Sequence, residues 1–247
     1  MLRRFSGAAR AMSRNFATTQ TIENEELILR HTILSRDHLT PEIGLRLITP
    51  ETGLWHDNGH NSSKIFDQDP FWAIHWPGGQ AIARFLLDHP EIVRKKRVFD
   101  LGCGGGAIAI AAALSGARYI MANDVDPLAL VATEINAGFN FVSSQIQVCA
   151  KDYLNNSFEL DDFDILLVGD MYFDEYIGQA VGQLARRFLV SGDQGSKSVY
   201  IGDPGRWFLT EHRPENMLCR AKFELPQNVK RENSGLSQGY VYEVVVE

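Results

Sequence analysis

The residues best suited to chemistry lie in one short segment. Residues 98–106 read VFDLGCGGG, an apolar run that ends on an acid and turns through glycines. A second acid, Asp124, follows 22 positions after Gly102 at the end of another apolar run. Glycine reaches positive φ without steric cost and lets a ligand approach the backbone, and the helix that follows offers free N–H groups. This pattern predicts a pocket for a cofactor that contains adenosine.

Two cofactors fit the spacing of these glycines. Gly102-x-Gly104-x-x-Ala107, with an acid about 20 residues further on, matches the dinucleotide pattern. Asp100 weighs against a dinucleotide, because an acid below a pyrophosphate would repel it. The same acid suits the sulfonium and ammonium groups of S-adenosylmethionine. The electrostatics therefore favour S-adenosylmethionine, while a nicotinamide dinucleotide and a glycine turn without any ligand stay open as alternatives.

Composition limits the class of protein. A chain of 247 residues with 45% apolar content is long enough for one large α/β domain with a buried core. No stretch reaches the roughly 18 consecutive apolar residues that a membrane span needs. The three cysteines, Cys103, Cys149 and Cys219, lie far apart. Their spacing predicts neither a disulfide framework nor a zinc site, and we expect no metal.

The first 16 residues have the composition of a mitochondrial presequence. They contain four arginines and no acid, since the first carboxylate is Glu23. Arg14-Asn-Phe-Ala17 also resembles a cleavage site of the matrix protease, so the pattern predicts a presequence over 1–16 and a protein of the mitochondrial matrix. A disordered basic tail is the alternative. The remainder would carry 20 basic and 31 acidic side chains, which would repel nucleic acid.

Strands and helices alternate through most of the chain. We expect a helix over 23–39, a short element over 40–49, a loop or lid over 50–70 and a helix over 77–88. Strands are predicted at 97–101, 119–123, 145–149, 164–169 and 198–202, with helices at 106–116, 127–140 and 174–190. The tail reads as strands near 220–225 and 240–246 around a polar loop, 230–239. This order predicts an α/β, Rossmann-like, seven-stranded and mostly parallel sheet with an antiparallel C-terminal strand and helices on both faces.

Polar residues follow four successive strands of this predicted sheet. Such sheets bind ligands at the carboxyl ends of their strands, where the strand order reverses. Four such ends in series make a binding site more probable than a chance acid at one end. The polar positions are Asp100, then Asn123 to Asp126, then Lys151-Asp152-Tyr153, then Gly169 to Tyr172.

Several longer motifs make the chain resemble a known family. The motifs span residues 39–236, and those at 76–80 and 201–206 are the most specific. The chain is similar to the seven-β-strand (class I) methyltransferases and, within them, to small protein lysine methyltransferases, most closely the mitochondrial group that acts on the electron-transfer flavoprotein β subunit. The motifs are LTPEI at 39–43, DPxWAI at 69–74, WPGGQ at 76–80, DLGxG at 100–104, ANDxDP at 122–127, GDM at 169–171, DE at 174–175, IGDPGR at 201–206 and ENSGL at 232–236.

The resemblance implies a role for each matching position. Asp100 and the turn formed by Gly102, Cys103, Gly104 and Gly106 would hold the methionine end of the cofactor. Other cofactor contacts are implied for Asp124 and Val125 at the ribose, Asp152 and Tyr153 at the adenine, Trp76, and Gly169. Asp170 and Tyr172 are the implied catalytic residues. Related enzymes carry D-x-x-Y here, whereas this chain has Asp170-Met-Tyr-Phe173, so either Tyr172 replaces the usual tyrosine or Phe173 only walls the pocket.

The resemblance also implies a division of the chain and a reaction. Residues 17–70 would form an N-terminal helix and lid region, and residues 71–247 the methyltransferase domain. We expect methylation of lysines of the electron-transfer flavoprotein β subunit; a small-molecule methyltransferase, and a non-catalytic or nicotinamide-dependent protein, remain the alternatives. Methyl transfer needs a neutral amine, although free lysine has a pKa of about 10.4. A carboxylate such as Asp170 can orient the ammonium as it arrives.

Overall fold

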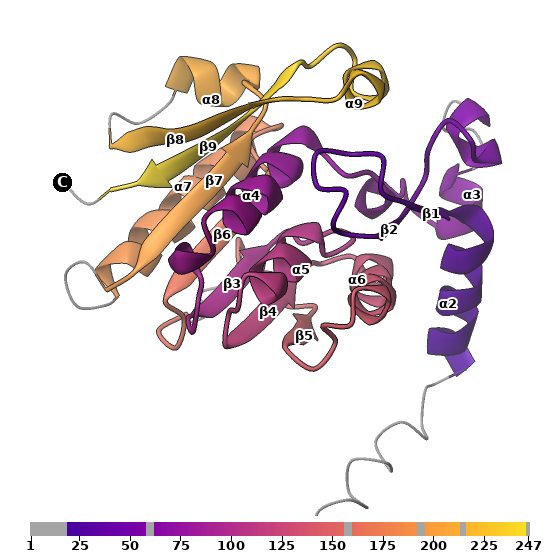
Figure 1. The fold of residues 1–247 in the computed structure, drawn as a ribbon, viewed down its shortest axis with the longest axis horizontal. Helices are drawn as coiled ribbons and strands as arrows, with labels where there is room; N and C mark the ends of the chain where they lie inside the picture. The colour runs from indigo at the N-terminus through magenta and orange to yellow at the C-terminus, as the bar shows by residue number, and fades with distance from the viewer. Residues whose placement is uncertain (1–18, 58–61, 156–159, 192–195, 213–215, 246–247) are drawn as a thin grey trace, which may run out of the picture.

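The computed structural model describes residues 19–57, 62–155, 160–191, 196–212 and 216–245. The presequence predicted over 1–16 lies outside these residues. A seven-stranded sheet forms the centre of the molecule, and its strands follow the order β5-β4-β3-β6-β7-β9-β8 (Figure 1). The strands are β3 (Arg97–Leu101), β4 (Tyr119–Asn123), β5 (Ile146–Cys149), β6 (Ile165–Gly169), β7 (Ser198–Asp203), β8 (Met217–Glu224) and β9 (Gln238–Val244).

The sheet has the predicted mixture of strand directions. The first five strands are parallel, whereas β9 runs antiparallel to both β7 and β8. The strand order reverses between β3 and β6, which are neighbours in the sheet although β4 and β5 separate them in sequence. In open α/β sheets this reversal is the place where ligands bind, at the carboxyl ends of the strands. The predicted fold class is confirmed.

Two apolar cores lie on opposite faces of the sheet. α4 (Pro77–Asp88), α5 (Ala107–Leu114) and α6 (Pro127–Phe139) cover one face, and α7 (Glu175–Val190) and α8 (Trp207–His212) cover the other. α6 begins where the sequence predicts a helix, and Asp126 caps it, because its carboxylate accepts the N–H of Leu128 at 2.8 Å. None of the described helices is both long and apolar enough to cross a bilayer.

The N-terminal segment differs from its prediction. α2 (Thr19–His31) ends well before residue 39, because Ile33–Ser35 (β1) pairs with Leu45–Leu47 (β2) instead of continuing the helix. The region 50–70 is also not all loop. It contains the short helices η1 (Gly53–Asp57) and α3 (Ser62–Phe66), and η2 (Phe71–Ala73) and η3 (Pro90–Ile92) flank α4. Helices of three to five residues are too short for a readable apolar period.

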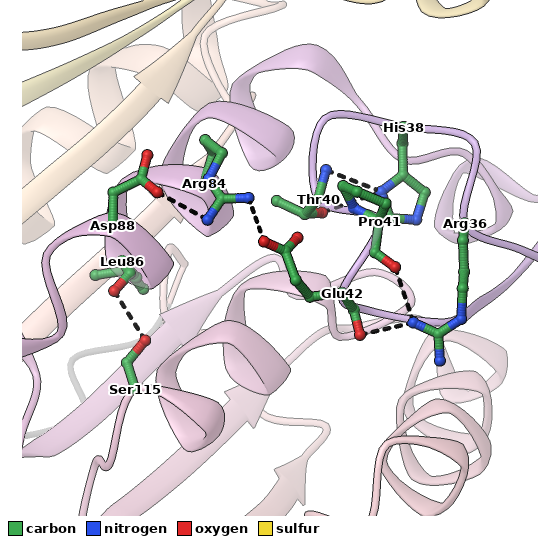
Figure 2. Close-up of polar contacts among 9 residues, drawn as sticks. All are labelled: Arg36, His38, Thr40, Pro41, Glu42, Arg84, Leu86, Asp88 and Ser115. Atoms are coloured by element: carbon green, nitrogen blue, oxygen red, sulfur yellow. Dashed lines mark hydrogen bonds and ion pairs between the residues drawn. The ribbon is translucent and has the colours of Figure 1, made fainter.

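Polar contacts fix this N-terminal segment to the helices below it. Arg84 of α4 pairs with Glu42 at 2.7 Å and with Asp88 at 2.8 Å (Figure 2). Arg36 donates to the carbonyl oxygens of Pro41 and Glu42 and thereby closes the loop that Figure 2 shows beside α4. On α6, Asn140 exchanges two hydrogen bonds with the backbone of Gly44. The described segment 36–46 is therefore packed against the sheet domain.

The C-terminal end also contains an element that sequence patterning missed. The predicted polar loop over 230–239 overlaps α9 (Gln227–Glu232), and its last residues belong to β9. Within α9 only Val229 is buried. A single apolar anchor leaves no helical period in the sequence, so the helix was not predictable from hydrophobic pattern alone.

Two glycines let α4 lie directly on the sheet. A Cβ on Gly202 would stand 2.1 Å from the carbonyl oxygen of Gly78, which is backbone and cannot move aside. We expect Gly202→Ala to lower the free energy of unfolding by about 3 kcal/mol, the upper end of the range for overpacking. Urea unfolding measures the change. Gly53→Ala is the matched control, because nothing lies within 4 Å of its added Cβ; equal effects of the two would contradict the close contact.

Candidate active site

The glycine turn after β3 adopts the backbone that its sequence predicts. Gly102, Gly104 and Gly106 have φ values of 65°, 51° and 81°, and α5 begins immediately afterwards. Thr133 of α6 donates to the carbonyl oxygen of Gly104 at 2.9 Å. Thr133 also lies where a Cβ on Gly106 would stand, at 2.7 Å. The turn is thus held from below by α6, and only glycine fits it.

Asp100 is buried below this turn, and only one of its two carboxylate oxygens accepts a hydrogen bond from the described residues. The side chain is fully buried, and Oδ2 accepts the N–H of Ala109 at 3.0 Å. Oδ1 has no hydrogen-bond partner among the described residues. Burial raises the pKa of Asp100 well above its usual range. A buried carboxylate with an open oxygen is costly, and a cationic ligand would offset this cost where an anionic one would increase it.

Asp124 and Asp126 shape the end of β4. Asp124 accepts the N–H of Gly104 at 2.9 Å and the N–H of Asp126 at 3.0 Å, one on each oxygen. Burial raises its pKa. The carboxylate therefore joins the glycine turn to the next strand, and each oxygen keeps a lone pair for a further donor. Val125 is 64% exposed beside it, on the same edge of the sheet.

Cys103 has the environment of a structural residue. Its thiol is buried, lies 3.5 Å from the hydroxyl of Thr133, and has a raised pKa because of burial. A raised pKa disfavours the thiolate that reactive cysteines need. Among the described residues no group of three or more His, Cys, Asp or Glu is placed to hold a metal ion.

Asp152 and Tyr153 lie after β5 but differ in their surroundings. Asp152 accepts the backbone N–H groups of Leu154 and Asn155 and the Asn155 side-chain amide, and the Asn155 hydrogen bonds lower its pKa. Its carboxylate thus builds the turn of residues 152–155. Tyr153 packs its ring on Phe99 of β3 at 4.7 Å, and burial raises its pKa to about 12. This ring lies in the apolar core of the α7 face.

Asp170 forms the most constrained contact at the carboxyl end of β6. Its side chain is 2% exposed, and Oδ1 lies 2.5 Å from Nε of Arg206. Oδ2 accepts the N–H of Gly78 at the start of α4 at 2.7 Å. The residue has a φ of 59°, a conformation that non-glycine residues adopt rarely and that often marks functional sites. Burial raises the pKa of Asp170, and Arg206 opposes that rise.

Asp203 adds a second buried carboxylate to this cluster. Its Oδ1 accepts the N–H groups of Gly205 and Arg206 at 2.7 Å each, and Oδ2 has no partner among the described residues. Burial, and then the neighbouring Asp170, raise its pKa to about 6. We call Asp170, Asp203 and Arg206 the acid cluster. With both carboxylates ionised it carries one net negative charge, which suits an incoming ammonium group.

Trp76 joins the acid cluster to the segment before α4. Its indole N–H donates to the carbonyl oxygen of Phe71 at 3.0 Å, and the guanidinium of Arg206 lies 5.8 Å from its ring centre. Gly169 lies one residue before Asp170, and a Cβ there would overlap Ile108 of α5 at 2.5 Å. Trp76 and Gly169 therefore both lie beside the acid cluster, and their predicted contacts with a cofactor stay predictions.

Tyr172 is buried within electrostatic range of Asp203. Its ring is 4% exposed and stacks on Phe208 of α8 at 6.2 Å, in the core of the α7 face. Burial raises its pKa strongly. Phe173, by contrast, is 59% exposed. Asp170 and Tyr172 are both buried, and the predicted catalytic roles of the two stay predictions.

The partner that sequence reasoning missed is Arg206. It lies in the IGDPGR motif, but no role followed from the motif alone. Arg206 is 36 residues from Asp170, and only the parallel pairing of β6 with β7 brings their ends together. Two cavities of about 680 and 780 Å³ lie under the N-terminal segment, and neither is lined by the glycine turn or the acid cluster.

Comparison with known proteins identifies the reaction class. The family model for ribosomal protein L11 methyltransferase (PrmA) matches residues 85–168. The electron transfer flavoprotein beta subunit lysine methyltransferase of Danio rerio is 43% identical over 211 residues, 85% of this chain and 78% of that protein. The human enzyme of that name is 39% identical over 85% of this chain and 77% of its own length. A Caenorhabditis elegans homolog is 32% identical over 88% and 94%.

The chain belongs to this lysine methyltransferase family. The predicted class of enzyme, a protein lysine methyltransferase, is confirmed. In this lysine methyltransferase the acid cluster lies at the end of β6 and the glycine turn at the end of β3, adjacent strands on either side of the reversal in strand order.

The raised pKa of Asp203 makes the stability of this lysine methyltransferase depend on pH. An acid with a pKa of about 6 in the folded state, against about 3.8 unfolded, binds its proton more tightly when folded. Its contribution to stability therefore falls as pH rises from about 4 through 6. Between pH 5 and pH 8 the loss is about 1.4 kcal/mol, the equivalent of one pKa unit.

We expect Asp203→Asn to remove this loss. Urea unfolding at pH 5 and pH 8 compares the variant with the natural protein. Glu211→Gln is the control, because Glu211 is exposed and lies in the next helix. An unchanged difference between the two pH values in Asp203→Asn would rule out Asp203 as its source.

Proposed function

We propose that the protein transfers methyl groups from S-adenosylmethionine to lysines of the electron transfer flavoprotein beta subunit, in the mitochondrial matrix. The observation that carries the proposal is the relationship to enzymes of that name over most of both chains. The arginine-rich, acid-free composition of residues 1–16 supports the location. The open oxygen of buried Asp100 supports a cationic cofactor over a dinucleotide.

The residues at the carboxyl ends of β3, β4 and β5 fit S-adenosylmethionine. When bound, this cofactor supplies a methyl group activated on a sulfonium. Asp100 and the glycine turn would hold its methionine end, since the open Oδ1 of Asp100 can accept an N–H of the ammonium. Asp124 keeps a lone pair on each oxygen for the ribose hydroxyls. Asp152 and Tyr153 would lie nearest the adenine, with Val125 and Trp76 beside the cofactor.

The acid cluster supplies what the acceptor lysine needs. Arg206 opposes the burial-induced rise in the pKa of Asp170 and fixes its position, while the net negative charge of the ionised cluster attracts the lysine ammonium. The open Oδ2 of Asp203 is an acceptor for one ammonium hydrogen, and a pKa of about 6 suits a group that accepts and releases a proton near neutral pH. Alignment of the neutral amine with the methyl carbon then provides most of the rate.

The function is tested with the full chain and purified electron transfer flavoprotein. Incubation with methyl-labelled S-adenosylmethionine should place label on lysines of the beta subunit, read by mass spectrometry. We expect Asp170→Asn to lower kcat by at least about 100-fold and to leave cofactor affinity within about threefold. Label found only in the small-molecule fraction would reject the protein substrate. An equal loss of turnover and cofactor binding would move Asp170 into the cofactor site.

The ribose assignment has its own test. We expect Asp124→Ala to weaken S-adenosylmethionine binding at least about tenfold in calorimetry, because hydrogen bonds to a charged acceptor contribute about 1.5–3 kcal/mol. Asp164→Ala is the matched control, because its carboxylate also accepts a backbone N–H, that of Arg97, at the opposite end of β3. Unchanged affinity in Asp124→Ala would show that another residue binds the ribose.

A further inference from the structure

Four large aromatic side chains around the acid cluster face solvent. Phe71, Phe173, Tyr176 and Trp207 are 62%, 59%, 65% and 66% exposed. Single exposed apolar residues are common on soluble proteins, whereas a group of them in one place marks an interaction surface. We call these four residues the aromatic rim.

Contacts place the aromatic rim around Asp170. The ring of Phe71 lies 6.2 Å from that of Trp76, whose ring in turn lies under the guanidinium of Arg206. Trp207 follows Arg206 directly and begins α8.

The other two members follow β6. Phe173 lies three residues after Asp170, and Tyr176 lies in the first turn of α7. The Tyr176 hydroxyl donates to Asn155, in the turn that Asp152 organises. The rim therefore reaches from the segment before α4 to the loop after β5 and encloses the acid cluster.

The same loops carry a strong excess of negative charge. Eleven acidic and two basic residues, Lys151 and Arg206, occur in six segments at this edge of the sheet, and the connection between β8 and β9 at the same edge adds one acid and two bases. These segments are 67–76, 100–106, 124–126, 151–155, 170–176 and 203–211. Such a field attracts a basic partner and repels nucleic acid and anionic membranes. It also opposes association of two copies through this edge, because each copy would present the same charge.

We propose that the aromatic rim is the docking surface for the protein substrate, and that it receives a lysine-bearing, basic surface with apolar side chains beside the lysine. The inference rests on the proposed function and extends it to how the client is recognised. Aromatic residues supply most of the energy at protein interfaces. Small molecules are instead held in concave pockets that bury most of their surface, whereas these four rings point outward.

The aromatic rim can contribute binding energy although it lies away from the reacting groups. Binding energy from these remote contacts positions one lysine for reaction. The acid cluster alone cannot distinguish that lysine from the many others on a protein surface. The rim therefore selects the client, and the acid cluster accepts its amine.

Two surface variants test the docking surface. Phe71→Ser and Trp207→Ser, singly and combined, are assayed for KM and kcat with the purified beta subunit, and for S-adenosylmethionine affinity by calorimetry. We expect the double variant to raise KM at least tenfold, with cofactor affinity and melting temperature unchanged. Phe141→Ser is the matched control, because Phe141 is 94% exposed but follows α6 at the opposite edge of the sheet.

A charge variant provides an independent measurement that needs no apolar truncation. Glu211→Lys, on the rim side, should raise KM severalfold and weaken the salt dependence of KM. Glu91→Lys, an exposed acid in η3 at the other edge, should change neither.

The outcomes separate the two proposals. An unchanged KM in both the aromatic double variant and Glu211→Lys would overturn the docking surface. Light scattering that shows a dimer of the natural protein and a monomer of the double variant would assign the rim to a second copy and also overturn it. If the natural protein methylates no lysine of the beta subunit, the proposed function fails, whatever the variants do.

Discussion

Burial of carboxylates at the carboxyl edge of the sheet is the constraint on which the rest of the structure depends. Asp170 is almost fully buried, which raises its pKa, and the Arg206 guanidinium and the Gly78 N–H, which contact its two oxygens, oppose that rise. These contacts join the start of α4, the end of β6 and the loop after β7. The Gly78–Gly202 approach brings the helix close enough for the first contact. Packing and electrostatics therefore depend on each other at this site, because loss of the close packing or of the paired groups leaves a buried charge without a partner.

Two buried oxygens are left open within this otherwise satisfied network. Asp100 Oδ1 lies below the glycine turn, and Asp203 Oδ2 lies in the acid cluster. Folding leaves both without a partner among the described residues, which costs stability. Lysine methylation brings together a cationic methyl donor and a lysine ammonium. Both groups carry positive charge, opposite to the charge of an ionised carboxylate. Under the proposed function, the protein gives up stability where it needs affinity, the usual trade at functional sites.

The elements outside the sheet domain support this edge rather than add chemistry of their own. The N-terminal segment is fixed to α4 through Arg84 and to α6 through Asn140. It thereby positions the segment that contains Phe71 and Trp76 beside the glycine turn, where a Cβ on Gly105 would stand 3.1 Å from the carbonyl oxygen of Trp72. The exposed aromatic side chains of this edge are consequently carried by anchored segments, which limits the entropy that binding a partner would cost.

The sequence by itself determined the sheet, the glycine turn and the reaction class. Strand–helix alternation, positive-φ glycines and helix starts such as Asp126 are local, so neighbouring residues encode them. Only the tertiary structure decided which residues share the site. Arg206 meets Asp170 because two parallel strands place their ends together, and Tyr172 turns into the core because α7 and α8 cover it. The early end of α2 and the short helix α9 were hidden for a related reason: long-range pairing or one buried side chain stabilises them, and neither leaves a period in the sequence.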